Sequence, residues 1–257
     1  MQRTAQGTVQ AGTVQAKKNH AETVQKETPP ADTPTEGAES FKREGGKMSL
    51  PEPYYQDSHV TIYNADCKEI LPLLDPVDLV LTDPPYGDIL TKKNGHGKLK
   101  ESAIRYGGGA WDIRPPQGNL HSLLSHGKKT MIWGGNYFSS ELPDSRCWLV
   151  WDKCNGESSF ADAELCWTNF DCAVRVKKHS VQSIQGRSHP TQKPVEIMSW
   201  CISLCPNEPQ TILDPFMGSG TTLRAAKDLN RKAIGIELEE KYCAIAVERL
   251  RQEVLAL

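Results

Sequence analysis

From His59 onward the chain alternates short apolar runs with amphipathic stretches, and this alternation constrains its fold more than any other feature. The apolar runs that indicate strands are 59–63, 77–82, 129–133, 147–151, 163–167, 173–177, 211–213 and 233–236. Helical patterns lie at 67–74, 192–205, 220–229 and 239–255. Because strands that alternate with helices form βα units, the sequence predicts an α/β fold with a doubly wound, mostly parallel sheet.

Two segments depart from this alternation. Residues 1–47 are rich in Thr, Gln, Glu, Ala, Lys and Pro, and the triplet Thr-Val-Gln recurs in them at 8–10, 13–15 and 23–25. So polar a segment buries too little apolar area to offset its ordering entropy, so we expect a disordered tail followed by one folded domain over 48–257. Residues 87–118 are rich in Gly, Lys and Pro, which predicts a long, mobile, basic loop that serves the function.

Composition excludes several classes of protein. The chain is 38% hydrophobic and 24% charged, and it has neither an apolar run of membrane-spanning length nor a signal peptide, so we expect a cytoplasmic protein without a membrane partner. The eight cysteines form no C-x-x-C pair, which favours reduced thiols over a metal site. The net charge is only −2, so a surface that binds nucleic acid would be a local patch.

The tetrapeptide Asp83-Pro84-Pro85-Tyr86 directly follows the apolar run 77–82. It places a carboxylate, a stiff backbone and an aromatic ring at the end of a predicted strand. These are the groups needed to hold a planar amino group, although Asp-Pro-Pro is also ordinary turn chemistry.

A second motif, Asp214 to Thr222 with the letters DPFMGSGTT, lies between a predicted strand and a predicted helix. Its glycines let the backbone approach a ligand, and its spacing is neither the dinucleotide fingerprint nor a P-loop. Glu237 ends the next strand, where an acid can accept hydrogen bonds from the two ribose hydroxyls of a nucleoside. The alternative is a tight strand-to-helix turn followed by a capping acid.

These two motifs, together with His189-Pro190-Thr191-Gln192-Lys193-Pro194 between them, resemble the S-adenosylmethionine-dependent DNA methyltransferases that modify amino groups. The catalytic motif precedes the cofactor motif, which is the permuted order of the β class. The resemblance covers about 59–250 and implies a Rossmann-like fold. Segments 133–138 and 148–153 resemble compact phage and prophage members of the family.

The resemblance implies a catalytic set made of Asp83, Pro84, Pro85 and Tyr86. Asp83 and the Pro84 carbonyl would accept hydrogen bonds from the target amino group, and Tyr86 would stack on a base flipped out of the duplex. Asp rather than Ser before Pro-Pro-Tyr is typical of adenine-N6 methylation. Cytosine-N4 methylation, RNA as substrate, and a catalytically idle DNA-binding protein on the same fold stay open as alternatives.

The resemblance also implies S-adenosylmethionine as cofactor. Phe216 would pack on its adenine near Asp66, Glu237 would hold the ribose, and Gly218 and Gly220 would admit the methionine moiety. The full predicted cofactor set is Asp66, Thr191, Lys193, Asp214, Phe216, Gly218, Gly220, Thr221 and Glu237, of which Thr191 and Lys193 would reach the methionine carboxylate. Asp66 could instead cap the following helix, and Lys193 could be a surface charge on a helix.

Double-stranded DNA is the expected partner. The chain has little sequence left for a separate target-recognition domain, so its specificity would be short or relaxed, or a homodimer would supply missing DNA contacts. A partner nuclease cannot be inferred. The predicted DNA contacts are basic or aromatic residues of two segments: Lys92, Lys93, Arg105, Tyr106, Trp111, Lys177, Lys178 and Arg187.

Overall fold

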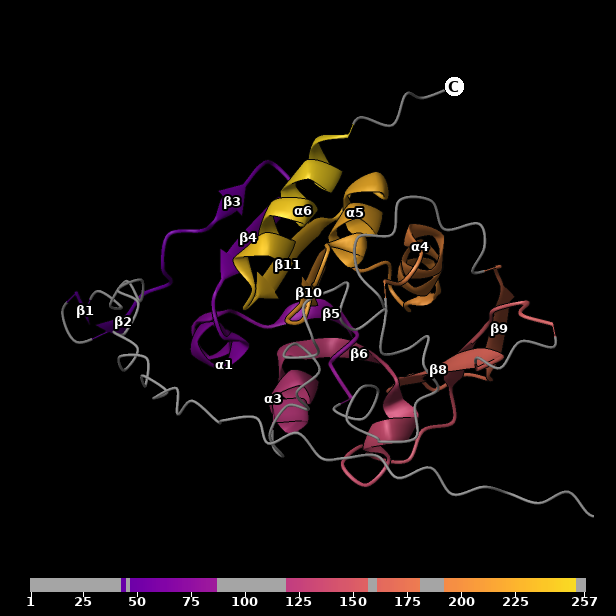
Figure 1. Ribbon diagram of the computed structural model, residues 1–257. Helices are drawn as coiled ribbons and strands as arrows, with labels where there is room; N and C mark the ends of the chain where they lie inside the picture. The colour runs from indigo at the N-terminus through magenta and orange to yellow at the C-terminus, as the bar shows by residue number, and fades with distance from the viewer. Residues whose placement is uncertain (1–42, 45–46, 87–118, 157–160, 181–191, 253–257) are drawn as a thin grey trace, which may run out of the picture. The chain divides into compact units, whose positions relative to one another are not determined.

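The computed structural model describes residues 43–44, 47–86, 119–156, 161–180 and 192–252 (Figure 1). Most of the predicted tail and the predicted loop over 87–118 therefore lie outside the described residues. The same holds for these predicted site residues: Lys92, Lys93, Arg105, Tyr106, Trp111, Arg187 and Thr191. Two short strands, β1 (Arg43–Glu44) and β2 (Lys47–Met48), pair antiparallel across the predicted start of the domain, and that boundary stays a prediction.

Nine strands of the described chain form one sheet in the order β3-β4-β11-β10-β5-β6-β8-β7-β9. The strands are β3 (Tyr55–Gln56), β4 (Val60–Asn64), β5 (Val77–Thr82), β6 (Gly127–Trp133), β7 (Trp148–Asp152), β8 (Ala163–Thr168), β9 (Arg175–Lys178), β10 (Thr211–Asp214) and β11 (Lys232–Glu237). The pairs from β4 to β6 and the pair β7–β9 are parallel, whereas β3–β4, β6–β8 and β7–β8 are antiparallel. The prediction of a mostly parallel sheet is confirmed.

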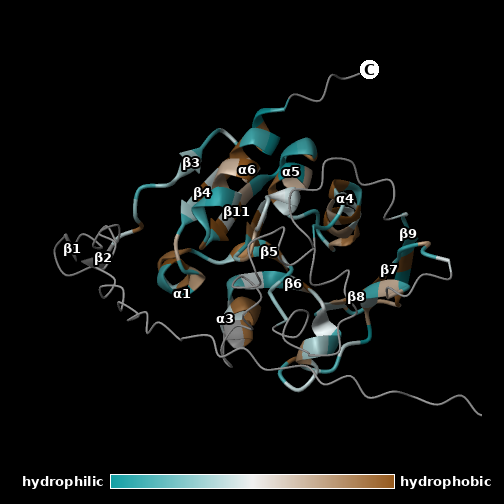
Figure 2. Ribbon diagram, in the orientation of Figure 1, coloured by the Kyte–Doolittle hydropathy of each residue, from teal (hydrophilic) through white to brown (hydrophobic). Residues whose placement is uncertain are grey.

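Helices cover both faces of this sheet (Figure 1). Helices α4 (Val195–Leu204), α5 (Thr221–Asp228) and α6 (Glu240–Arg251) share one hydrophobic cluster with the sheet. A second cluster joins α1 (Cys67–Ile70), the 3-10 turn η1 (Leu71–Leu73), α3 (Asn119–His126) and the 3-10 turn η2 (Gly135–Phe138). Figure 2 shows hydrophobic residues along α3 and mixed character on α4, as expected of helices that bury one side. No helix in the described ranges is long and apolar enough to cross a membrane.

Three of the elements that differ from the sequence prediction are α3, β3 and α4. Helix α3 and strand β3 were not predicted, because α3 follows a glycine-rich segment without a capping signal and β3 has only two residues. Helix α4 begins at Val195 and not at residue 192, since Pro194 is its N-cap in an extended conformation, with φ −61° and ψ 143°. A proline also disfavours helical geometry in the residue before it, so Lys193 is no longer expected on a helix surface.

The topology brings the two motifs together. Strands β5 and β10 are parallel neighbours, and the catalytic motif follows β5 while the cofactor motif follows β10. The chain continues from β5 to β6 on one side and from β10 to β11 on the other, so the strand order reverses between them. Ligands of open α/β sheets bind at the carboxyl ends of the strands at such a switch point.

Candidate active site

The catalytic carboxylate of Asp83 is held from two sides. The Lys193 ammonium lies 2.5 Å from Asp83 Oδ2, and the Tyr86 hydroxyl donates a hydrogen bond of 2.5 Å to Oδ1. Lys193 comes from the extended segment before α4, so two segments far apart in sequence meet here. The side chain of Lys193 is only 3% exposed, which makes it a buried partner of Asp83 and not a surface charge.

A second carboxylate shares the same ammonium. Glu164 of β8 places Oε2 2.9 Å from Lys193 Nζ, and its Oε1 lies 2.5 Å from Lys153 Nζ, just beyond the end of β7. Lys193 also lies 5.5 Å from the centre of the Trp133 ring, a cation–π distance. The buried charges therefore alternate in sign, and each has a partner within ion-pair distance.

Burial and these partners act in opposite directions on the pKa values of the site. Burial raises the pKa of Asp83, and the Lys193 ammonium opposes this rise. Burial also raises the pKa of Glu164, but the ammonium groups of Lys193 and Lys153 outweigh it and bring the pKa to about 2. Burial lowers the pKa of Lys193, whereas the two carboxylates raise it well above its usual value, so Lys193 stays protonated.

The ring of Tyr86 is part of an aromatic group at the end of the sheet. It stacks on Tyr137 of η2 with ring centres 4.6 Å apart and an angle of 22°, and it meets Phe138 edge-on at 6.1 Å. Gly134 has φ +67°, and a Cβ at this position would collide with the Tyr86 ring. Glycine is thus required there both for the backbone conformation and for the position of Tyr86.

The cofactor motif forms a tight turn anchored by Asp214. This buried carboxylate accepts hydrogen bonds from Thr82 Oγ1 at 2.8 Å and from the Phe216 backbone N–H at 3.2 Å. Burial is the main reason that the pKa of Asp214 is raised to about 7. The bond to Thr82 joins the end of β10 to the end of β5, so Asp214 fixes the position of the cofactor motif relative to the catalytic motif.

The two predicted cofactor glycines have different surroundings. Gly218 has φ +50°, and a Cβ there would meet no heavy atom within 4 Å, which leaves open space in front of its backbone. Gly220 has φ +76° and caps α5, and a Cβ there would lie 2.7 Å from the Cβ of Ala246 on α6. Gly220 is therefore required for helix packing, while Gly218 is the one that faces space for a ligand. Thr221, which begins α5, is buried.

Glu237 closes the other side of this turn from the end of β11. Its Oε2 accepts the Gly218 N–H at 3.0 Å, and its Oε1 accepts the Glu239 N–H at 2.8 Å. Burial raises the pKa of this carboxyl group, while the two backbone donors oppose the rise. Each oxygen keeps a further lone pair, so Glu237 can orient the turn and still accept hydrogen bonds from a ligand.

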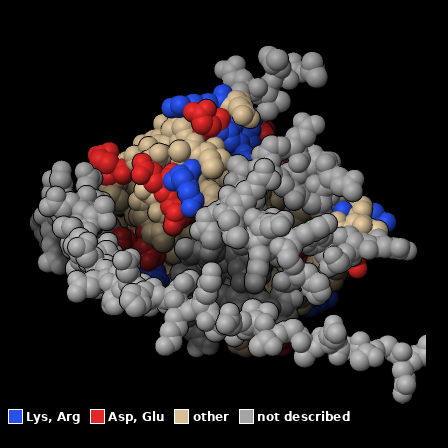
Figure 3. Space-filling model, viewed as in Figure 1, with Lys and Arg blue, Asp and Glu red and all other residues tan. Residues whose placement is uncertain are grey.

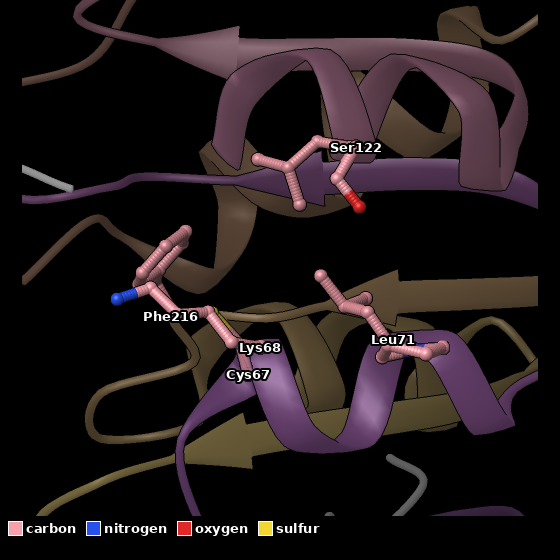
Figure 4. A pocket seen from close by; sticks show the side chains of 7 residues that line it. Cys67, Lys68, Leu71, Ser122 and Phe216 are labelled. Carbon is pink, nitrogen blue, oxygen red and sulfur yellow. The ribbon is translucent and has the colours of Figure 1, made fainter. Parts of the chain in front are cut away.

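A pocket of about 130 Å³ adjoins this turn. Figure 4 shows it between α1 and α3, with the Phe216 ring at one end and Ser122 across from Leu71. Its lining is mostly apolar: Cys67, Lys68, Leu71, Pro72, Ser122, Leu123 and Phe216. A flat apolar ring such as a purine fits walls of this character.

Asp66 lies at the start of α1 and is its N-cap. Its Oδ1 accepts the Lys68 backbone N–H at 3.0 Å, which is the capping role considered for it from the sequence. Its contact with a cofactor adenine stays a prediction, as does the contact of Lys193 with a methionine carboxylate.

The structure thus brings most of the described site residues to the carboxyl ends of the central strands, and it adds others that were not predicted. Lys177 and Lys178 lie on β9, the outermost strand of the sheet. The additional residues are Gly134, Tyr137, Lys153 and Glu164. One signal could have indicated Glu164: it is a charged residue inside an otherwise apolar strand, Ala-Glu-Leu-Cys-Trp.

The chain is similar to known DNA methyltransferases. A family model described as DNA methylase, of the N6/N4 type, matches residues 126–248. The Type II methyltransferase M2.LlaDCHI of Lactococcus lactis subsp. cremoris is 26% identical over 80% of this chain and 95% of its own length. The Type II methyltransferase M.HindIII of Haemophilus influenzae is 53% identical over a shorter match, which covers 24% of this chain and 20% of that protein.

Among solved structures, the PvuII DNA methyltransferase, described as cytosine-N4-specific, has a TM-score of 0.55 at 15% identity and covers 79% of this chain and 90% of its own. This likeness shows the fold alone. The matched family model and the Type II relatives define an S-adenosylmethionine-dependent methyltransferase. The chain is a DNA methyltransferase with a domain of the N6/N4 type.

Proposed function

We propose that this enzyme transfers a methyl group from S-adenosylmethionine to the N6 amino group of adenine in double-stranded DNA. One observation supports this most directly. The Asp83 carboxylate, held by Lys193 and Tyr86, ends a strand that is the parallel neighbour of the strand ending in the cofactor motif. An acceptor for an amino group and a turn for a nucleoside cofactor thus lie side by side.

The residues of the cofactor turn fit S-adenosylmethionine. The apolar pocket beside Phe216 suits the adenine, Glu237 has lone pairs for the ribose hydroxyls, and the open space before Gly218 admits the methionine chain. When bound, the cofactor supplies an electrophilic methyl group on a sulfonium centre.

The catalytic motif would prepare the target amino group for attack. Asp83 and the Pro84 carbonyl accept its two N–H groups, which draws the nitrogen lone pair out of conjugation with the base. Holding the nitrogen in this position supplies much of the rate enhancement, since the reacting atoms no longer have to find one another. Tyr86 and the neighbouring Tyr137 offer an aromatic surface for the flipped base.

Methyl transfer to unmethylated duplex DNA tests this function. With tritiated S-adenosylmethionine, we expect label in the DNA, and nucleoside mass spectrometry is expected to find N6-methyladenine. Finding N4-methylcytosine instead would show that Asp83 holds a cytosine, which is the second candidate. RNA offered in competition should leave the transfer to DNA unchanged.

DNA would approach the edge of the sheet that carries the catalytic motif. Lys177 and Lys178 lie on β9, and Figure 3 shows Lys and Arg side chains in the region where Figure 1 places this strand. Basic residues of this kind contact phosphates and position a duplex without reading its sequence. We propose that a homodimer extends this surface, and that the enzyme belongs to a restriction–modification system, as its Type II relatives do.

Replacing Glu237 with Gln should weaken cofactor binding about tenfold. The amide keeps one acceptor oxygen but loses the charge, and a hydrogen bond to a charged group contributes about 1.5–3 kcal/mol. Calorimetric titration with S-adenosylmethionine measures the effect. The control is Glu239→Gln, which removes a half-exposed carboxylate two residues away. Equal affinities for the two variants would contradict the ribose-binding role of Glu237.

A further inference from the structure

The charged groups behind the catalytic motif form one continuous line. Lys153 contacts Glu164 Oε1 at 2.5 Å, Glu164 Oε2 contacts Lys193 at 2.9 Å, and Lys193 contacts Asp83 Oδ2 at 2.5 Å. Tyr86 ends the line on the other oxygen of Asp83. The reactive end of this line is the catalytic motif, to which Asp83 and Tyr86 both belong.

The line is built on rigid parts of the fold. Glu164 lies on β8, which pairs with β6 on one side and β7 on the other, and it is opposite Trp151 of β7 in the register. Lys153 follows β7 directly. The exposed fractions of the side chains are 15% for Lys153, 27% for Glu164 and 3% for Lys193. Their positions are therefore set by the sheet and not by solvent.

Asp83 has to meet two requirements: it must stay charged, and it must still accept a hydrogen bond from the target amino group. A buried carboxylate without a cation becomes protonated and loses its value as an acceptor. A cation that pairs with it completely would instead compete with the target amino group for Oδ2. Sharing the Lys193 ammonium with Glu164 leaves Asp83 charged and still able to accept a hydrogen bond.

We propose that Glu164 is a positioning residue for methyl transfer: it shares the Lys193 ammonium with Asp83 and so keeps Asp83 Oδ2 available to the target amino group, while the ammonium keeps Asp83 charged. Lys153 limits this sharing, because it occupies the other oxygen of Glu164. The inference rests on the proposed methyl transfer. A structural ion pair alone is a weaker account, because a buried ion pair is often no more stabilising than apolar residues of similar volume.

Several titratable groups face this site and enter its pH dependence. Besides the line itself, Asp214 acts on Asp83 from the end of β10, and the thiols of Cys166 and Cys201 face Lys193 from β8 and α4. Burial raises the pKa of both thiols, so they stay neutral near pH 7. Near pH 7 these thiols therefore add no charge to the site, whereas Lys193 and Glu164 both act on the pKa of Asp83.

The test measures the pH profile of kcat for Glu164→Gln and Lys153→Gln, with the full-length chain, duplex DNA and labelled S-adenosylmethionine. Without its charge, residue 164 no longer draws the ammonium from Asp83, so kcat should fall about tenfold, the size of one weakened charge-assisted hydrogen bond. Its acidic limb should move to lower pH, because a negative charge that raises the pKa of Asp83 is gone.

Lys153→Gln should shift the acidic limb the opposite way, to higher pH. With its Oε1 no longer neutralised, Glu164 draws the ammonium more strongly and leaves Asp83 less stabilised as a carboxylate. The dissociation constant for S-adenosylmethionine and the KM for DNA should stay within about twofold of wild type in both variants. The control is Glu196→Gln, on the exposed side of α4, which should match wild type throughout.

Four results would overturn the inference. Acidic limbs that coincide in both variants and wild type would show an ion pair with no bearing on Asp83. A matching fall in kcat for Glu196→Gln, or a parallel loss of cofactor affinity in Glu164→Gln, would show general damage. Any of these three results leaves the proposed function standing, provided that the wild-type enzyme is active. No methyl transfer by the wild-type chain would overturn both the inference and the proposed function.

Discussion

Asp83→Ala is expected to reduce methyl transfer by about 10²–10³-fold, the largest effect among the substitutions proposed for this enzyme. The change removes the acceptor that orients the target amino group, and loss of one such catalytic hydrogen-bonding group typically costs 10²–10³ in kcat. It also removes the partner that Lys193 and Tyr86 share, so the ammonium keeps only Glu164. Single-turnover methylation of duplex DNA measures the effect on the chemical step.

Cofactor affinity separates this loss from general damage. The cofactor turn is anchored by Asp214 and Glu237, so Asp83→Ala should bind S-adenosylmethionine within about twofold of wild type in calorimetry. Asp75→Ala is the matched control, because Asp75 is an exposed acid just before the same strand, β5. The mechanism would be refuted if Asp83→Ala kept more than a tenth of the wild-type rate.

The catalytic and cofactor motifs could be predicted because their information is local. Asp83-Pro84-Pro85-Tyr86 follows a buried strand, and the glycine turn before α5 sits between a strand and a helix, so each motif places its own residues. The parallel pairing of β5 and β10 follows from the alternation of strands and helices, and it brings the two motifs together. Short-range patterns were enough for this part of the site.

The charged line behind Asp83 could not be predicted, because it depends on pairings between distant segments. Glu164 reaches Lys193 only because β8 inserts antiparallel between β6 and β7, and nothing local to residue 164 specifies that position. Lys193 was placed on a helix because apolar residues follow it at helical spacing. Pro194 is extended and caps α4, so the helix begins only at Val195. Lys193 therefore precedes the helix and is buried in the site.

Lys193→Met should lower the free energy of unfolding by about 3–5 kcal/mol at pH 7.5, because removing one partner of a buried ion pair leaves uncompensated charge. Here the two carboxylates of Asp83 and Glu164 would face each other without their shared cation. Urea unfolding followed by circular dichroism measures the difference. Methyl transfer should also fall at least about tenfold, since Asp83 then takes up a proton and stops accepting from the target.

The pH dependence of this loss distinguishes an electrostatic cause from a packing cause. In the wild type the pKa of Glu164 is lowered to about 2, so its stabilising contribution is present above the unfolded pKa and is lost as the pH falls toward 2. In Lys193→Met both carboxylates have raised pKa values, and protonating them relieves the repulsion. The stability gap should therefore narrow as the pH is lowered from 7.5 to 4.

A control variant sets the scale for this measurement. Lys241→Met removes a half-exposed lysine whose partner Glu239 is equally exposed, and surface pairs of this kind contribute about 0–1 kcal/mol. Its stability difference from wild type should be small at both pH values. A difference in the free energy of unfolding between Lys193→Met and wild type that stays constant from pH 7.5 to pH 4 would mean that the lysine stem stabilises the site by packing. The chain would then not need a charge partner for Asp83 in order to fold.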